Sequence, residues 1–440
     1  MTTSSPSLKS TIGLPQAVAL YISSVLGSGV LIVPGLAAEM AGPASLLAWG
    51  FMVLLILPLA LSMGLLSAQY PNAGGVSHFV TLAFGRKAGT LVGWFFLMSV
   101  PIGAPVAALT GAGYMSAAMG WGEPVRLLLA IAILAAGLGM NIIGMQLAGK
   151  VQIAVVIAIV AVLVFAFAAA LPEIHSQNFT PFAPHGYGSV GQSAAILFWC
   201  FIGWEAVSHL SEEFSDPRRA AIQGVTIAAL VVGVLYFLSA LAVVGTASYT
   251  GGASDASLVR IISEPLGAWG GLIAGLTGMF ICAATIIAYV GAASRVAYAL
   301  ARQGSAPGWM GKLSASRGTP TGALLFLLLC FTLVMALYGT GAVSLSQLIQ
   351  FPNATFILTY IGGCAAGIRL LKGSRLGVAI SWISFAATAA VFPFTGRAIA
   401  YPLVIIVFFV GFLLYKERRI RHAHQITERQ EESAGHTETG

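Results

Sequence analysis

Long apolar segments follow one another along almost the whole chain, and they restrict what it can fold into. Twelve of them reach the roughly 20 residues that a helix needs to cross a bilayer. Only 8% of the 440 residues are charged and 58% are hydrophobic, a composition that excludes a soluble globular domain. We therefore predict an all-α integral membrane protein with twelve transmembrane helices. The predicted spans are approximately 14–38, 44–68, 90–118, 125–144, 151–171, 190–212, 221–247, 268–294, 321–339, 343–368, 376–393 and 397–415.

The distribution of lysine and arginine predicts the orientation of these spans. If the N-terminus is cytoplasmic and the sides alternate, 18 of the 21 basic residues lie in cytoplasmic loops and termini. The outer set is Arg126, Arg260 and Arg397. Because basic residues concentrate on the cytoplasmic side of membrane proteins, we predict that both termini are cytoplasmic. The net charge of +7 is spread over short loops, so it does not indicate a nucleic-acid partner.

The sequence lacks the usual patterns of catalytic and metal sites. The four cysteines lie inside apolar segments and their spacing matches no metal site, so we expect free thiols. We find no HExxH motif, no phosphate-binding loop and no Ser/His/Asp set. We therefore expect no metal, no cofactor and no enzymatic activity.

Small polar residues interrupt the first apolar segment, where a lipid-facing helix would have Leu or Val. They include Ser24, Gly27, Ser28 and Gly29. Gly27 and Gly29 would lie about 200° apart on a helix, so they do not form one packing face. A helix that unwinds here exposes amides that suit a carboxylate and carbonyls that suit an ammonium. The alternative is close packing of an intact helix, since Gly and Ser are common in membrane spans.

The sixth apolar segment has the features of a second break. Gly203 lies in its middle, with Trp199, Phe201 and Trp204 around it. Glu205 is the only acidic or basic residue that we find well inside a predicted span. An ionisable group at this depth costs about 2.5–3.5 kcal/mol on insertion scales and usually faces a polar interior. The alternative is an aromatic packing cluster in which Glu205 is hydrogen-bonded to a neighbouring helix.

The two interrupted segments occupy matching positions in the chain. If spans one to five and six to ten are repeats, an odd number of spans gives the repeats opposite orientations. Paired breaks of this kind indicate a binding site near the membrane midplane. The predicted organisation is a cytoplasmic N-terminus (1–13), two five-helix repeats (14–171 and 190–368), two peripheral helices (376–415) and a disordered tail (418–440).

Several motifs in this order resemble the amino acid–polyamine–organocation superfamily of transporters. The first span carries Gly27-Ser28-Gly29-Val30, and the following loop carries Tyr70-Pro-Asn-Ala-Gly-Gly-Val76. The sixth span carries Trp199-Cys-Phe-Ile-Gly-Trp-Glu205 and is followed by Glu212-Glu213-Phe-Ser-Asp-Pro217-Arg218. The eighth span ends in Ser294-Arg295-Val-Ala-Tyr298. Within the superfamily, Phe198-Trp-Cys-Phe with His209-Leu210, together with Gly74-Gly-Val-Ser-His78, resembles bacterial exporters of methionine and branched-chain amino acids.

The resemblance implies roles for residues at both breaks. It implies that Ser28 and the amides of Gly27 and Gly29 meet a substrate carboxylate. It also implies that carbonyls near Val25, Trp199 and Ile202 meet the ammonium, that Trp199 covers the substrate, and that Glu205 is linked to gating or to protons. The candidate substrate-binding residues are Ser24, Val25, Gly27, Ser28, Gly29, Trp199, Cys200, Phe201 and Ile202.

We therefore expect a secondary active transporter that exports methionine, leucine, isoleucine and valine by alternating access. The expected location is a bacterial inner membrane, and the expected partners are the amino acid, lipid and, as a candidate coupling ion, the proton. One rival is an uptake carrier or exchanger with the same fold. A second is an intramembrane enzyme, but Glu205 has no acidic partner at membrane depth. A third is a channel, which would need a continuous polar pore.

Overall fold

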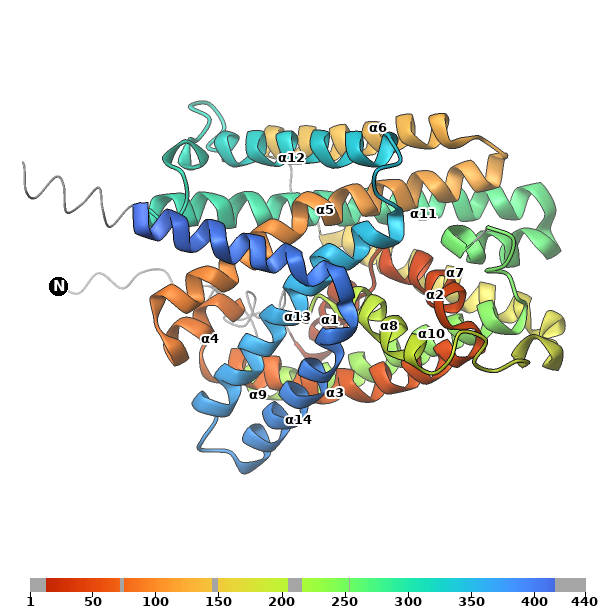
Figure 1. The fold of residues 1–440 in the computed structure, drawn as a ribbon, viewed down its shortest axis with the longest axis horizontal. Coiled ribbons are helices and arrows are strands. Elements are labelled where there is room, and N and C mark those ends of the chain that lie inside the picture. Colours follow the sequence, from red (N-terminus) through yellow and green to blue (C-terminus); the bar gives the residue numbers. More distant parts are fainter. Residues whose placement is uncertain (1–12, 72–74, 145–148, 205–215, 253, 416–440) are drawn as a thin grey trace, which may run out of the picture.

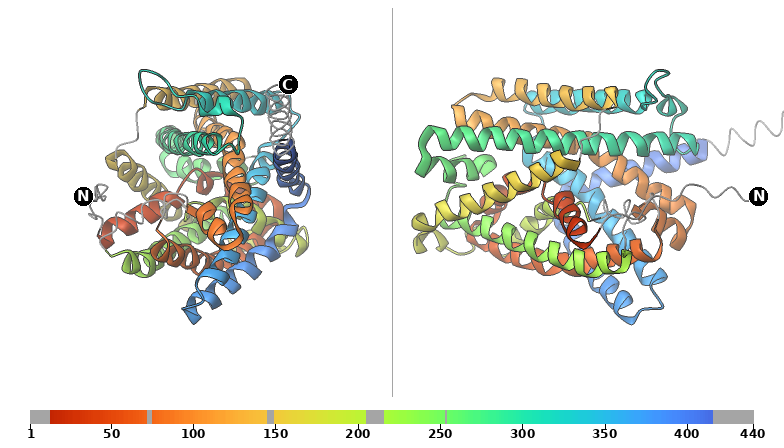
Figure 2. Two further views of the ribbon diagram at one scale, coloured as in Figure 1. Left: turned by 90° about the vertical axis from the view of Figure 1, so that its left-hand side faces the viewer. Right: turned by 180° about the vertical axis from the view of Figure 1, so that it is seen from behind.

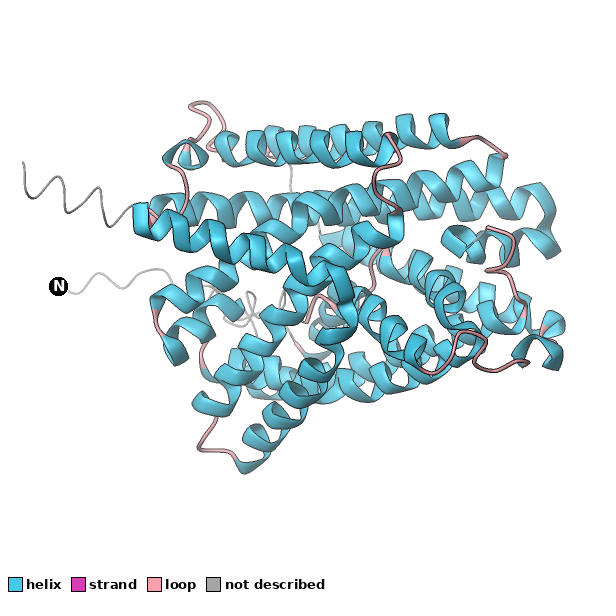
Figure 3. Cartoon of the chain, in the orientation of Figure 1, coloured by secondary structure: helices cyan, strands magenta, loops and turns pink. Residues whose placement is uncertain are grey.

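Helices make up the regular structure of the described part of the chain. The computed structural model describes residues 13–71, 75–144, 149–204, 216–252 and 254–415, and these contain helices and loops but no strand (Figure 3). Within these residues, nine helical stretches are long and apolar enough to cross a membrane. The all-helical class is therefore confirmed, whereas the twelve-span count and the inverted repeats stay predictions.

The helices follow the predicted apolar segments, and the first segment is split in two. A short helix, α4, lies between the second and third predicted spans. The helices are α1 (Leu14–Val25), α2 (Gly29–Ala41), α3 (Ser45–Gln69), α4 (Gly75–Phe84), α5 (Arg86–Met119), α6 (Glu123–Ile143), α7 (Gly149–Ala170), α8 (Gly188–Leu197), α9 (Pro217–Arg219), α10 (Val225–Gly245), α11 (Ser257–Arg302), α12 (Thr321–Gly339), α13 (Leu345–Leu370) and α14 (Arg375–Val391), followed by helical residues 400–415.

Helix α11 begins eleven residues before the predicted eighth span and is kinked where that span begins. The eighth span was expected to begin near 268, but α11 begins at Ser257 and runs for 46 residues. Arg260 and Glu264 obscured this start, because charged residues break an apolar pattern without breaking a helix. Gly267 (φ 57°) bends the chain at the place where the predicted span begins, so α11 consists of a short and a long part.

The two longest helices, α5 and α11, lie side by side and antiparallel across the molecule (Figure 1). Small residues let their backbones approach: a Cβ added at Gly111 would lie 2.9 Å from the Cβ of Cys282. One added at Gly275 would lie 3.1 Å from the Cα of Met115. In membranes, helices associate through such close packing. The start of α5 is also tied to the end of α11, because Trp94 Nε1 donates to the carbonyl of Ser305 at 2.9 Å.

The remaining helices cover this pair on two sides. Helices α6 and α12 lie beside each other along one edge, outside α5 and α11 (Figures 1 and 2). On the opposite side α2, α8, α10 and α3 pack together, so the interrupted helices lie in the interior. Trp49, Phe201 and Tyr236 form a buried aromatic cluster there, with ring centroids 5.3–6.1 Å apart.

Candidate functional site

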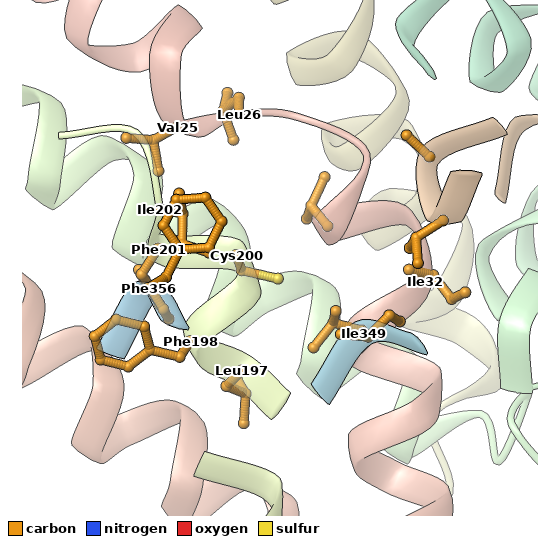
Figure 4. Close-up of a cluster of buried hydrophobic side chains, with 14 of the residues drawn as sticks. Val25, Leu26, Ile32, Leu197, Phe198, Cys200, Phe201, Ile202, Ile349 and Phe356 are labelled. Carbon is orange, nitrogen blue, oxygen red and sulfur yellow. The ribbon is translucent and has the colours of Figure 1, made fainter. Parts of the chain in front are cut away.

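The first apolar segment breaks where its glycines and serines predicted. Helix α1 ends at Val25, Leu26 has an extended ψ of 93°, and α2 begins at Gly29 (Figure 4). Backbone carbonyls at the end of α1 and amides at the start of α2 therefore lack their usual helical partners. The side chain of Ser28 is 3% exposed and makes no capping hydrogen bond to α2. The break confirms the predicted interruption, while its role in binding stays a prediction.

The second break lies directly against the first. Helix α8 continues as one 3₁₀ turn, Phe198–Phe201, after which Ile202 is extended and Gly203 has a φ of 127°. This conformation favours glycine. A Cβ at position 203 would lie 2.1 Å from the carbonyl oxygen of Ser24, so the two backbones touch. Figure 4 shows Val25 beside Ile202 and Phe201, where the two backbones meet.

A second contact joins the start of α2, after the first break, to the turn that ends α8, before the second break. A Cβ at Gly29, the first residue of α2, would lie 2.9 Å from Cδ1 of Trp199 and 3.2 Å from the sulfur of Cys200. The start of α2 therefore rests on the end of α8. We call the segments 24–29 and 199–203, with these contacts, the junction.

Tyr236, from α10, links the carbonyl groups of the junction. Its hydroxyl oxygen lies 3.0 Å from the carbonyl oxygen of Val25 and 3.0 Å from that of Cys200. A tyrosine hydroxyl carries one hydrogen, so it cannot fully satisfy both acceptors at once. The ring is completely buried. Acceptor capacity for a cationic donor thus remains at the junction, in the position where the sequence predicted an ammonium.

Two further tyrosines bind the backbone of the broken helices. The hydroxyl of Tyr114, from α5, donates to the carbonyl of Leu31 in α2. The amide of Gly203 donates to the hydroxyl of Tyr360, from α13, at 3.4 Å. Both rings are fully buried. Because a buried tyrosine hydroxyl needs a polar partner, Tyr114 holds the backbone of α2 and Tyr360 holds the backbone of the second break.

Asn353, also from α13, braces α8 just before the break. Its side-chain amide donates to the carbonyls of Ala195 at 3.1 Å and Ile196 at 3.2 Å. The residue is completely buried and follows Pro352, which interrupts the hydrogen bonding of α13. Helix α13 is therefore bound to both ends of the second break.

The predicted side chains differ in how they relate to the junction. The hydroxyl of Ser24 donates to the carbonyl of Tyr21 within its own helix, at 2.9 Å. Phe201 points into the cluster with Trp49, and Cys200 is 1% exposed. Trp199 is only partly buried. The structure places Ser24 against Gly203, and Trp199 and Cys200 against Gly29, but the sequence did not indicate which way each side chain points.

Several residues at the junction were not singled out from the sequence. They are the three tyrosines, Asn353 and Thr285, whose side chain lies 3.8 Å from the Cβ position of Gly27. The tyrosines and Asn353 could have been found from the sequence as polar residues inside apolar spans. Such a residue needs a buried polar partner. Glu205 lies outside the described residues. In the described part of the chain, no three His, Cys, Asp or Glu residues come together as a metal site.

Comparison with known proteins identifies similar chains. A family model described as amino acid permease matches residues 12–422. The uncharacterized amino acid permease YecA of Bacillus subtilis is 38% identical over 400 residues, covering 91% of this chain and 94% of YecA. The L-methionine/branched-chain amino acid exporter YjeH of Escherichia coli is 34% identical over 369 residues, covering 83% and 87%. The branched-chain amino acid permease BcaP of Bacillus subtilis is 26% identical over 391 residues, covering 84% and 83%.

Proposed function

The chain belongs to the amino acid permease family, in the amino acid–polyamine–organocation superfamily, and we propose that it exports methionine and branched-chain amino acids. In this proposal it is a secondary transporter of a bacterial inner membrane that works by alternating access. Its twelve spans form two inverted five-helix repeats and two peripheral helices, with both termini in the cytoplasm.

The contact between the two helix breaks carries this proposal. Gly203 lies against Ser24, and Gly29 lies against Trp199, so the carbonyl end of α1 and the amide end of α2 both lie against the second break. The partial positive charge at the start of α2 favours a carboxylate. The carbonyls of Val25 and Cys200 share one hydroxyl donor, which leaves acceptor capacity for an ammonium. An amino acid zwitterion supplies both charges.

The side chains of the junction support an apolar substrate. Trp199, Cys200 and Ile202 carry no charge. Among the described residues, the polar side chains that bind the backbone of the junction include the hydroxyls of Tyr236 and Tyr360. A charged substrate side chain would lose its water here without gaining an ionic partner. A thioether or a branched alkyl group does not have this cost, which favours methionine, leucine, isoleucine and valine.

The direction of transport depends on the gradients of substrate and coupling ion across the membrane. The similarity to the exporter YjeH supports export. The similarity to the branched-chain amino acid permease BcaP supports branched-chain substrates. A second candidate is an uptake carrier or exchanger of neutral amino acids with the same fold. Glu205 is proposed as the gating or proton-linked residue in either case.

Transport by purified protein in liposomes tests the proposal. Proteoliposomes are preloaded with labelled methionine, and release is followed with and without a pH gradient. We expect release that saturates with methionine and is inhibited by leucine, isoleucine and valine, but poorly by lysine and glutamate. Best inhibition by lysine or arginine would contradict the apolar site. Release that rises linearly with concentration would indicate a channel instead.

A further inference from the structure

The indole ring of Trp199 is held between glycines of two different helices. At one end, its Cδ1 atom lies 2.9 Å from the position that a Cβ of Gly29 would take. At the other end, its Cη2 atom lies 2.9 Å from the Cβ position of Gly103, in the middle of α5. The ring therefore extends from the start of α2 to α5, with each end against bare backbone.

Glycine is needed at these two positions because a side chain has no room there. Neither Gly29 nor Gly103 belongs to the residues with positive φ, so backbone conformation does not demand glycine at either place. A Cβ contact of 2.9 Å is closer than packed side chains tolerate, so a methyl group at Gly103 must displace what it meets. The atoms that it meets are the three outer carbons of the six-membered ring of Trp199, at 2.9, 3.6 and 3.9 Å.

We propose that Gly103 is a positioning residue that sets the orientation of Trp199 and, through it, the size of the substrate side chain that the site accepts. This inference rests on the proposed function, in which Trp199 covers the substrate. Because α2 blocks the other end of the ring, an added methyl at Gly103 cannot be relieved by sliding the ring lengthwise. The ring must instead rotate, and it then occupies space that a long substrate side chain needs.

The proposal has a specific structural rival. Pro101 and Pro105 lie on either side of Gly103, and each removes one hydrogen bond of α5. Helix α5 could therefore bend at these prolines and carry the added methyl away, while Trp199 stays in place. The two possibilities differ in whether the effect of Gly103→Ala depends on the size of the residue at 199.

A double-mutant cycle in proteoliposomes separates them. We measure KM and kcat for methionine and for valine in wild type, Gly103→Ala, Trp199→Phe and Gly103→Ala/Trp199→Phe. Gly103→Ala should raise KM for methionine about fivefold or more, within the range that overpacking by one methyl produces, and raise KM for valine less. In the double variant, Trp199→Phe should restore the ratio of the KM for methionine to the KM for valine, because a phenyl ring does not reach Gly103. Equal effects on both substrates, or no restoration, would overturn the proposal.

Matched controls come from the same helix. Gly111→Ala introduces a methyl with an identical 2.9 Å approach, but toward Cys282, so Trp199→Phe should not compensate for it. Gly93→Ala meets its nearest atom only at 3.6 Å and should behave like wild type. If Trp199→Phe compensated for Gly111→Ala equally well, the specific contact between Gly103 and Trp199 would be refuted.

A substrate-independent measurement distinguishes failure of this inference from failure of the proposed function. Thermal unfolding of the four purified proteins in detergent should show that Gly103→Ala lowers the Tm and that Trp199→Phe removes most of that loss. Additive Tm changes would refute the contact, whatever the protein transports. Wild-type protein that releases neither methionine nor valine would refute the proposed function, and the Tm cycle would still decide whether Gly103 positions Trp199.

Discussion

The hydroxyl of Tyr236 lies 3.0 Å from the carbonyl oxygen of Val25, the last residue of α1, and it lies equally close to the carbonyl of Cys200. One side chain from α10 thus reaches both broken helices at the points where their backbone hydrogen bonds end. A hydroxyl shared by two acceptors stabilises their mutual position and leaves part of their capacity free.

Removal of this hydroxyl should weaken the junction. Tyr236→Phe leaves two buried carbonyls without their donor, which we expect to cost about 1–3 kcal/mol and to lower the Tm measurably. Transport should fall as well, because α1 and α8 lose their common support. The control is Tyr187→Phe, since Tyr187 is 70% exposed and should show no change. A Tyr236→Phe protein with wild-type Tm and transport would contradict this role.

Gly203 should tolerate no side chain. Gly203→Ala combines a φ of 127° with a clash against the carbonyl of Ser24, so we expect loss of transport or of folding. Gly318→Ala is the control, because Gly318 has a φ of 66° but nothing within 4 Å of its Cβ position. It should cost only the free energy of holding alanine at a positive φ, about 1–2 kcal/mol. Similar losses of Tm in both variants would show that the contact between the breaks is unimportant.

The start of α2 should be more sensitive at Gly29 than at Gly27 or Ser28. Gly29→Leu places bulk against Trp199 and Cys200, and we expect it to abolish methionine transport in inserted protein. The methyl group of Gly27→Ala would lie 3.8 Å from Thr285, so this variant should lose little transport. The larger side chain of Gly27→Leu should reduce transport strongly. Ser28→Ala removes a hydroxyl and leaves the amides, so transport should persist. Normal flux through a well-folded Gly29→Leu protein would rule out the proposed site.

An ion pair away from the junction should contribute to stability. Arg126 Nη1 lies 2.7 Å from Asp255 Oδ2, and the arginine side chain is 12% exposed. Asp255→Ala removes the closer and less exposed carboxylate of Arg126 and leaves only Glu123, which we expect to cost up to about 3 kcal/mol. Glu123→Gln should cost less than about 1 kcal/mol, because Glu123 lies 3.5 Å away and is 58% exposed. Tm values that reverse this order would contradict the assignment.

The prediction for Glu205 comes from the sequence, since the residue lies outside the described residues. If Glu205 exchanges a proton in each cycle, Glu205→Gln should flatten the pH dependence of efflux and uncouple it from a pH gradient. If it only donates a hydrogen bond to a gate, Glu205→Gln should transport nearly normally and Glu205→Ala should not. Initial rates of efflux measured against pH separate these outcomes. Identical profiles for all three proteins would eliminate both roles.

The backbone features of the site could be predicted, because local sequence determines them. Gly27, Ser28 and Gly29 in an apolar run predicted the break before α2, and Gly203 predicted the one after α8. Apolar length likewise predicted the positions of most helices, since each span must bury a fixed length of backbone.

The supporting side chains could not be predicted in the same way. Tyr236 is 211 residues from Val25 along the chain, and Asn353 is 157 residues from Ile196. Nothing in the local pattern indicates such pairings, because they follow from how the helices pack. Gly103 is a further example, since its requirement for space comes from a ring on another helix. A single sequence shows that position 103 is a glycine in the middle of a span, but not which neighbouring side chain lies against it.

The length of the α5–α11 pair has a consequence for the lipid around the protein. At 1.5 Å per residue, the 34 residues of α5 extend about 51 Å, well beyond a hydrocarbon layer of about 30 Å. The hydrogen bond from Trp94 to Ser305 and the close glycine contacts fix the two helices to each other, so the pair cannot shorten. It has to match bilayer thickness by tilting or by deforming the membrane. Acyl-chain length should therefore change the tilt of α5, and with it the angle at which Gly103 meets the indole of Trp199.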